Sequence, residues 1–162
     1  MTSNKPDNAG EILIALGANI SSHVGPPLAT LKAALAALEK AGVTVLRVSA
    51  FYETKAWPNP ADPPFVNAVA AIQTHLQPFA LLTILHEVET AYGRKRSAPN
   101  APRTLDIDLI DYQGRVEEGA VQLPHPFAVH RRFVLEPLKT VSPGWRHPVS
   151  GLDLDALLAA IG

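Results

Sequence analysis

The chain has 162 residues, 47% hydrophobic and 18% charged, which is the balance of a soluble globular domain long enough to bury one core. Its net charge of −1 argues against a nucleic-acid groove, which needs a basic excess, so a small anionic molecule is the better class of partner. The absence of cysteine excludes disulfides, thiolate catalysis and cysteine zinc sites.

The first residues of the sequence are polar and lack the apolar segment of a signal peptide. We predict a disordered tail over residues 1–10 and a single domain over residues 11–162. No apolar run reaches the roughly 18 residues that a membrane span requires. We therefore expect a cytoplasmic monomer with neither a membrane nor a nucleic acid as partner.

Two strands and a helix are predicted in the first third of the chain. Residues 11–16 are apolar and too few for a helix, so they indicate a buried strand that ends at Gly17. Glycine there permits either a plain tight turn or a close approach of the backbone to a ligand. A helix begins at Pro26–Pro27 and ends at Gly42, and the β-branched and aromatic residues of 43–52 predict a second strand.

A proline-rich loop precedes the third predicted strand. Residues 55–64 contain four prolines, so they cannot form regular structure. Trp57 in this loop either closes over a ligand or packs against the body of the protein. Residues 65–75 are apolar on both faces, which predicts a central strand. Asn67 inside it either ties down a neighbouring loop or contacts a polar ligand, because a buried amide must find partners.

A second helix is predicted from Pro78 to Gly93, with His86 and Glu89 on one face beside its apolar stripe. Such a pair usually lies exposed at the surface. Here the helix runs directly into the basic loop 93–103, so the same face is also a candidate for the lining of a cleft.

The basic loop leads into a short strand that carries Asp106 and Asp108. Their alternation with large aliphatic residues has a period of two, so both carboxylates point to one face with Cα atoms about 6.6 Å apart. Such oxygens can converge on cations about 3.5–4 Å apart, as a magnesium-bound polyphosphate requires. The alternative is a pair of exposed acids that solvate the sheet beside a solvated basic loop.

The last third of the chain contains a constrained histidine and two short helices. His125 lies between two prolines in extended backbone and is followed by Arg131 and Arg132, so it either binds phosphate or caps a turn. Residues 134–140 and 152–161 predict helices that cover one side of the sheet.

The order of these elements predicts an α+β fold with a ferredoxin-like βαββαβ core. Its sheet is mainly antiparallel, its helices lie on one face, and the C-terminal helices are additions. We expect loops 17–25, 53–64 and 93–103 to build a site on the other side of the sheet.

Several motifs in this order match those of one family. They are A-L-G-A-N-I at 15–20, V-S-A-F-Y-E-T at 48–54, F-V-N-A-V at 65–69, H-E-V-E-T-A-Y-G-R at 86–94, A-P-R-T-L-D-I-D-L-I at 101–110, L-P-H-P at 123–126 and R-R-F-V-L-E-P-L at 131–138. The chain resembles the 6-hydroxymethyl-7,8-dihydropterin pyrophosphokinases of folate biosynthesis. The resemblance extends from about Ile12 to Pro148 and implies that residues 11–162 form one pyrophosphokinase domain.

The resemblance implies the transfer of pyrophosphate from ATP to the hydroxymethyl group of the pterin, with release of AMP. Asp106 and Asp108 match the ligands of two Mg²⁺ ions. The positions that match the other contacts with ATP are Arg94, Arg96 and Arg103 for the triphosphate, Glu89, His125 and Arg131 for further nucleotide contacts, and the backbone of Leu109 for adenine. The positions that match contacts with the pterin are Phe65 and Phe133 for its two faces, and Asn67, Thr54, Lys55 and Trp57 for its polar edge.

The sequence departs from the family at Pro99-Asn100, where Arg-Trp is common. Arg94 and Arg96 are therefore expected to stabilise the charge of the transition state instead. Some members have Gln at the position of His86, and some have Tyr at the position of Pro126. Two other functions compete with the enzyme. A nucleotide sensor would bind ATP without turnover, whereas RNA binding by the sheet is disfavoured because no strand carries paired aromatic residues.

Overall fold

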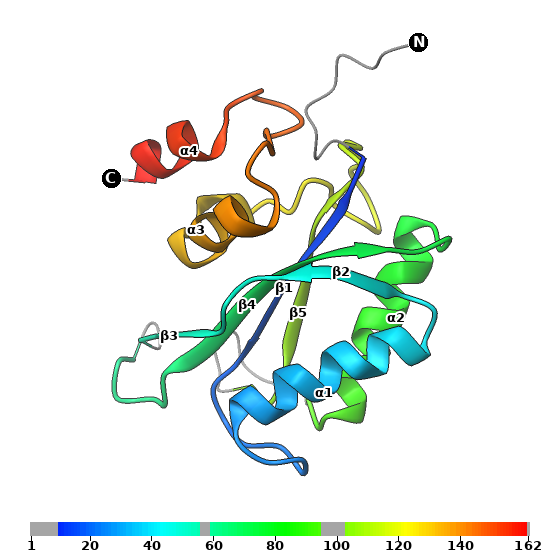
Figure 1. Ribbon diagram of the computed structural model, residues 1–162, viewed down its shortest axis with the longest axis vertical. Coiled ribbons are helices and arrows are strands. Elements are labelled where there is room, and N and C mark those ends of the chain that lie inside the picture. Colours follow the sequence, from blue (N-terminus) through cyan, green and yellow to red (C-terminus); the bar gives the residue numbers. More distant parts are fainter. Residues whose placement is uncertain (1–9, 56–58, 95–102, 162) are drawn as a thin grey trace.

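A computed structural model describes residues 10–55, 59–94 and 103–161 of the chain (Figure 1). The predicted tail up to residue 9, Trp57 and Arg96 lie outside the described residues, as do Pro99 and Asn100. The elements in chain order are β1 (Ile12–Ala18), α1 (Pro27–Lys40), β2 (Thr44–Val48), β3 (Tyr52–Thr54), β4 (Phe65–Gln73), α2 (Pro78–Ala91), β5 (Asp106–Tyr112), a 3₁₀ turn η1 (Ala128–His130), α3 (Arg132–Val141) and α4 (Leu154–Ile161).

One antiparallel sheet forms the centre of the molecule. Its strand order is β2-β4-β1-β5, and the short β3 also pairs with β4. The strand predicted over 43–52 is therefore divided into β2 and β3. The division falls at Ser49, whose hydroxyl accepts a hydrogen bond from the Val69 backbone N–H at 2.9 Å. In a regular antiparallel pair this N–H would bond a backbone carbonyl of the neighbouring strand. Because the Ser49 hydroxyl accepts the bond instead, the strand pairing is interrupted at this point.

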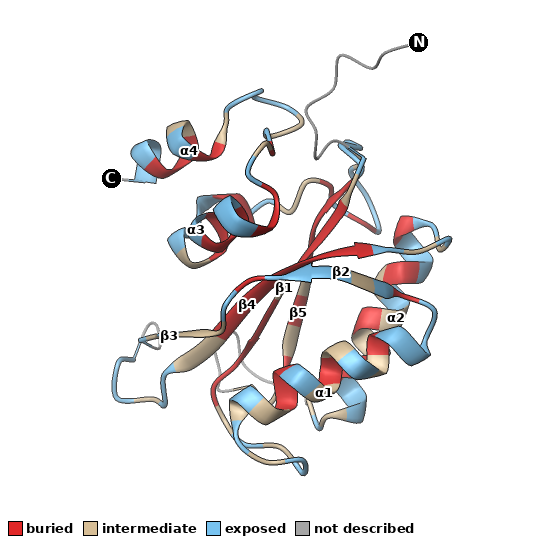
Figure 2. Ribbon diagram, in the orientation of Figure 1, coloured by how far each residue is buried: buried red, intermediate tan, exposed pale blue. Residues whose placement is uncertain are grey.

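Helices cover both faces of the sheet, as Figures 1 and 2 show. One core contains α1, α2 and the side chains of β1 that include Ile12 and Ile14. The other contains α3, α4, Leu13 of β1 and Ile110 of β5. The two helices of the predicted core, α1 and α2, lie on one face of the sheet, and the C-terminal pair, whose face the sequence left open, packs on the opposite one. The cause is that successive side chains of β1 are buried on both sides.

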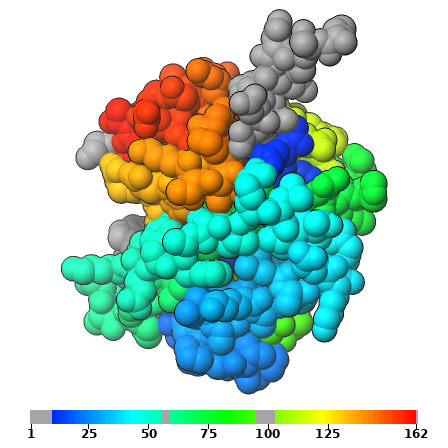
Figure 3. Space-filling view, viewed as in Figure 1, coloured from blue at the N-terminus to red at the C-terminus, as the bar shows by residue number. Residues whose placement is uncertain are grey.

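In the space-filling view the C-terminal segment with α3 and α4, coloured orange to red, lies at the top, and α1, in blue, lies at the bottom (Figure 3). Helix α1 begins with proline at its first position and buries Leu31 and Leu38 fully. Leu28, one turn earlier, belongs to the same stripe in sequence but is 40% exposed. Among the described residues no helix is long and apolar enough to span a lipid bilayer.

Candidate active site

The floor of the site is formed by small residues of the central strand β1. Gly17 pairs with Asn67 of β4 on one side and with Asp106 of β5 on the other, and Ala15 pairs with Asp108. A Cβ atom added at Gly17 would lie 3.2 Å from the Asn67 amide oxygen and 3.7 Å from the Phe65 ring. Glycine therefore leaves open the space between the amide and the carboxylates.

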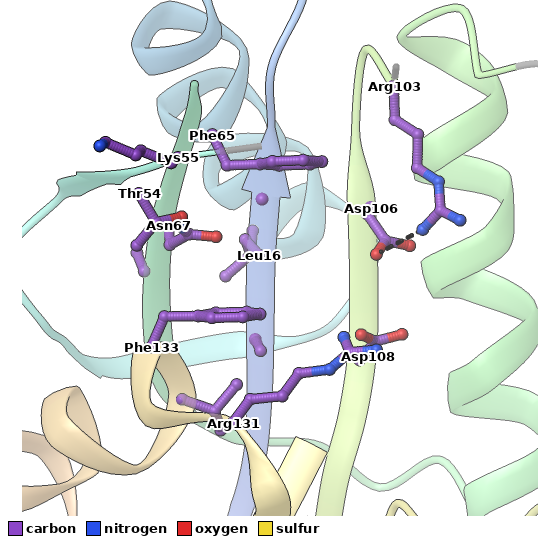
Figure 4. Close-up of a pocket in the computed structure, with 14 residues that line it drawn as sticks. Leu16, Thr54, Lys55, Phe65, Asn67, Arg103, Asp106, Asp108, Arg131 and Phe133 are labelled. Atoms are coloured by element: carbon purple, nitrogen blue, oxygen red, sulfur yellow. Dashed lines mark hydrogen bonds and ion pairs between the residues drawn. The ribbon is translucent and has the colours of Figure 1, made fainter. Parts of the chain in front are cut away.

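The first cavity, which we call the aromatic compartment, has a volume of about 380 Å³. The rings of Phe65 from β4 and Phe133 from α3 face each other across it, with the Asn67 amide between them (Figure 4). The Asn67 amide nitrogen donates to the Thr54 hydroxyl at 2.8 Å, which fixes the orientation of the amide. The compartment is lined by Ala15, Leu16, Gly17, Thr54, Lys55, Phe65, Asn67, Ala68, Arg103, Asp106, Asp108, Arg131, Phe133 and Val134.

The second cavity, which we call the charged compartment, has a volume of about 430 Å³. It lies between α2, β5 and the segment from Gly119 to Phe127. Its lining includes His86, Glu89, Arg94, Leu109 and His125. Arg103, Asp106 and Asp108 line both compartments and so form their shared wall. Every predicted site residue among those that the structure describes lines one of the two compartments.

A chain of ion pairs crosses the shared wall. The Arg94 guanidinium contacts Asp106 at 2.6 Å and Glu89 at 2.7 Å, and Arg103 contacts the other oxygen of Asp106 at 3.0 Å. Asp106 is thus held between two cations from opposite ends of the 93–103 loop. These cations are available for anionic groups of a ligand when a divalent cation takes their place at the carboxylate.

Asp108 is paired with His125, whose Nε2 atom lies 3.6 Å from a carboxylate oxygen. The other ring nitrogen, Nδ1, accepts hydrogen bonds from the backbone N–H groups of Phe127 and Ala128 at 3.1 and 3.0 Å. The neutral ring therefore carries its proton on Nε2, aimed at Asp108. Burial raises the pKa of Asp108, but His125, Arg131 and Arg103 outweigh it and lower the pKa overall. Asp108 is an anion at neutral pH.

The donor set of the shared wall fits Mg²⁺. Over the parts of the chain that the structure describes, no cluster of three or more His, Asp or Glu side chains is arranged to enclose a metal ion. Mg²⁺ does not need one, because it is usually bound by one or two carboxylates together with water and substrate phosphates. The side chains of Asp106 and Asp108 are 20% and 28% exposed, so both carboxylates are accessible.

A model of the 7,8-dihydro-6-hydroxymethylpterin-pyrophosphokinase family matches residues 13–143 of this chain. The chain belongs to this family. It is 36% identical over 158 residues to the 2-amino-4-hydroxy-6-hydroxymethyldihydropteridine pyrophosphokinase of Synechocystis sp., with 96% of this chain and 78% of the relative covered. It is 38% identical over 152 residues to the enzyme of the same name from Pseudomonas aeruginosa, with 92% and 90% covered.

The fold of this pyrophosphokinase is also similar to that of longer proteins. The Plasmodium falciparum HPPK-DHPS structure matches with a TM-score of 0.70 at 13% sequence identity. The match covers 98% of this chain and 45% of that one, so the chain spans less than half of the longer protein. At this level of identity the similarity concerns the fold alone.

One buried residue of the pyrophosphokinase was missed by reasoning from sequence. Asn19, only 3% exposed, accepts a hydrogen bond from the Arg103 backbone N–H at 2.7 Å and donates one to the Pro63 carbonyl at 3.1 Å. It thus joins three loops around the site. The available signal was a polar residue directly after the first strand, but neither partner is near it in sequence.

Of the two places that the sequence left open for Glu89, an exposed surface pair and the lining of a cleft, the structure shows the second. Glu89 is 3% exposed, and its carboxylate accepts a hydrogen bond from the backbone N–H of Ile107 at 2.7 Å, between the two aspartates of β5. Burial raises the pKa of Glu89 to about 7, against the opposing effects of the Ile107 bond and the Arg94 charge. In the pyrophosphokinase without ligands, Glu89 therefore gains its charge near neutral pH.

The raised pKa predicts how stability changes with pH. Between about 4.5 and 7, Glu89 holds a proton in the folded but not in the unfolded chain, so stability falls as pH rises through this interval. The test is urea denaturation at pH 5 and pH 8, without nucleotide and magnesium. From pH 5 to pH 8 the free energy of unfolding of the wild type should fall by on the order of 2 kcal/mol more than that of Glu89→Gln. Glu87→Gln, an exposed change on the same helix, should follow wild type. Equal pH slopes for Glu89→Gln and wild type would contradict the assignment.

Proposed function

We propose that the two compartments bind the two substrates of the family's reaction and that the shared wall is where pyrophosphate passes between them. The family membership assigns the chain the pyrophosphokinase activity of folate synthesis. The observation that carries the proposal is that Arg103, Asp106 and Asp108 line both cavities. A donor phosphate on one side and an acceptor hydroxyl on the other would meet at these residues.

The aromatic compartment is proposed to take 6-hydroxymethyl-7,8-dihydropterin. Two facing phenyl rings suit a flat heteroaromatic ring, which gains from stacking on both faces. The Asn67 amide, held by Thr54, offers fixed polar atoms to the edge of such a ring. Lys55 at the rim and Trp57 in the adjacent loop are proposed to complete the contacts with the pterin.

The charged compartment is proposed to take ATP. Arg94, Arg96 and Arg103 would neutralise the triphosphate, and the Nε2–H of His125 would donate to a phosphate oxygen. Glu89 and the backbone of Leu109 are proposed as further nucleotide contacts. Arg131 is also proposed as a nucleotide contact, although it lines the aromatic compartment, because its charge acts on Asp108 at the shared wall. Strand β5 lies at the edge of the sheet, which leaves one side of its backbone free of strand pairing for adenine.

Asp106 and Asp108 are proposed to hold two Mg²⁺ ions, which when bound would neutralise phosphate charge and lower the pKa of the acceptor hydroxyl. The residues of the chain supply the rest. Phe65 and Phe133 would hold the pterin so that its hydroxymethyl oxygen faces the β-phosphate, and positioning of this kind is the main requirement of phosphoryl transfer. Arg103, which touches both compartments, would stabilise the charge that develops between them.

Three broader features complete the proposal. The antiparallel order β2-β4-β1-β5, with α1 and α2 on one face, supports the ferredoxin-like split βαβ plan for the core. We propose that residues 11–162 form a single domain with residues 1–10 as a tail. We also propose that the protein acts as a monomer in the cytoplasm, where ATP is available.

The proposal is tested by AMP release from Mg-ATP, which should require the hydroxymethyl-dihydropterin. Phe65→Ala should weaken pterin binding about tenfold or more, because one stacking face is lost, and should leave binding of a non-hydrolysable ATP analogue unchanged. Phe79→Ala is the matched control, since Phe79 is 63% exposed on α2 and lines neither compartment. ATP binding without any pterin-dependent AMP would instead support the sensor.

A further inference from the structure

The two rings of the aromatic compartment belong to different parts of the fold. Phe65 is on β4, in the sheet. Phe133 is in the first turn of α3, which packs on the sheet through the core that it shares with α4. The gap between the rings therefore depends on how the start of α3 is held against the sheet. A flat ring gains stacking from both faces only when that gap matches its thickness.

The backbone of Phe133 lacks its usual helical partner. In an α-helix the carbonyl of residue 133 accepts a hydrogen bond from the N–H of residue 137. Here residue 137 is proline, inside α3, and proline has no N–H. A proline ring inside an α-helix also crowds the carbonyl four residues earlier. The Phe133 carbonyl thus needs a donor from outside the helix.

Tyr52 supplies that donor. Its phenolic hydroxyl hydrogen-bonds the Phe133 carbonyl oxygen across 81 positions of sequence. Tyr52 lies on β3, where it pairs with Asn67, and Thr54 of the same strand pairs with Phe65. Burial and the nearby Glu136 raise the pKa of Tyr52, so the phenol keeps its proton and remains a donor at neutral pH. The strand that orients the Asn67 amide also holds the opposite ring.

We propose that Tyr52 is a positioning residue that sets the width of the aromatic compartment by tying the Phe133 carbonyl, left open by Pro137, to strand β3. Tyr52 does not line the cavity, and it acts through Phe133. The inference rests on the proposed function, because it assumes that a flat ring binds between Phe65 and Phe133. It predicts that loss of one hydroxyl group outside the cavity weakens binding of the pterin and not of ATP.

The test is Tyr52→Phe, which removes the hydroxyl and keeps the ring. The KM for the pterin should rise about fivefold to tenfold, as expected for loss of a hydrogen bond that orders a binding wall. The kcat at saturating pterin and the Kd of an ATP analogue should change less than twofold. Tyr112→Phe is the matched control, because the Tyr112 hydroxyl bonds the Leu76 carbonyl, another backbone acceptor, away from both compartments.

The control separates positioning from plain stability. Both variants are expected to lower Tm, but only Tyr52→Phe should raise the KM for the pterin. If the two variants lose Tm alike and both keep the wild-type KM, the Tyr52 bond is merely structural and the proposal is overturned. If wild type itself shows no pterin-dependent AMP release, the proposed function fails first, so the two failures are distinguishable.

A second variant tests the role of proline. Pro137→Ala restores the helical N–H, which then competes with Tyr52 for the same carbonyl. We expect Pro137→Ala to raise the KM for the pterin about twofold to threefold. Adding Tyr52→Phe to this variant should raise the KM by a smaller factor than Tyr52→Phe does in the wild type. If the KM increase of the double variant equals the product of the two single increases, Tyr52 and Pro137 do not act on one carbonyl, and the mechanism is overturned.

Discussion

Replacing Asp108 by asparagine should lower the kcat for AMP formation by about a thousandfold, the scale on which active sites lose a preorganised charge-stabilising group. The amide has nearly the same shape but carries no charge, and Asp108 is the acid that its surroundings keep ionised. His125 and Arg131 would then face a neutral group. Magnesium-dependent binding of an ATP analogue, measured by calorimetry, should weaken together with turnover.

Asp155→Asn is the control for this change. Asp155 is an aspartate on α4 whose side chain is 86% exposed, and it lines neither compartment. Its replacement should leave both turnover and magnesium dependence at wild-type values. An Asp108→Asn enzyme that turned over normally would remove the metal assignment, whereas loss of activity in both variants would point to a general fault of folding.

Replacing Arg103 by alanine should lower kcat by about a hundredfold. Arg103 is the cation that touches both compartments, bonds Asp106 at 3.0 Å and has its backbone fixed by Asn19. Removal of its guanidinium leaves charge uncompensated at the point where the phosphoryl group would pass. Arg103→Lys should recover part of the loss, because it restores a point charge but not the planar fork.

Arg115→Ala serves as the comparison for Arg103. Arg115 also forms an ion pair, with Glu117 at 2.8 Å, but lies outside both compartments. Its replacement should change kcat less than twofold, because exposed ion pairs contribute little and this one touches no substrate. A similar loss in both variants would contradict a specific role for Arg103 at the shared wall.

The parts of the site that could be predicted from the sequence are those set by short-range periodicity. Asp106 and Asp108 share a face because strand side chains alternate. Glycine at position 17 predicted a close approach of the backbone, although the strand expected to end there continues to Ala18. The central place of β4 followed from its apolar residues on both faces. Each of these inferences uses residues that are neighbours in the chain.

The parts that could not be predicted depend on contacts between distant segments. Asn19 meets Arg103 across 84 positions, and Tyr52 meets Phe133 across 81. The burial of Glu89 depends on β5 lying beside α2, which its local pattern with His86 does not reveal. The face covered by α3 and α4 likewise depends on both sides of β1 being apolar, so length and periodicity of the helices alone left it open.

The pairing of β5 with β1 has a consequence for how the chain folds. Asp106 lies opposite Gly17 and Asp108 opposite Ala15, with Ile107 between them facing the helix-covered core. If β5 paired with β1 one position out of register, both carboxylates would point into the hydrophobic core and the aliphatic residues would be exposed instead. The two carboxylates proposed to hold the metal ions thereby also penalise misaligned strands, so a chain that has paired wrongly here would be less stable and would lose the arrangement of the shared wall.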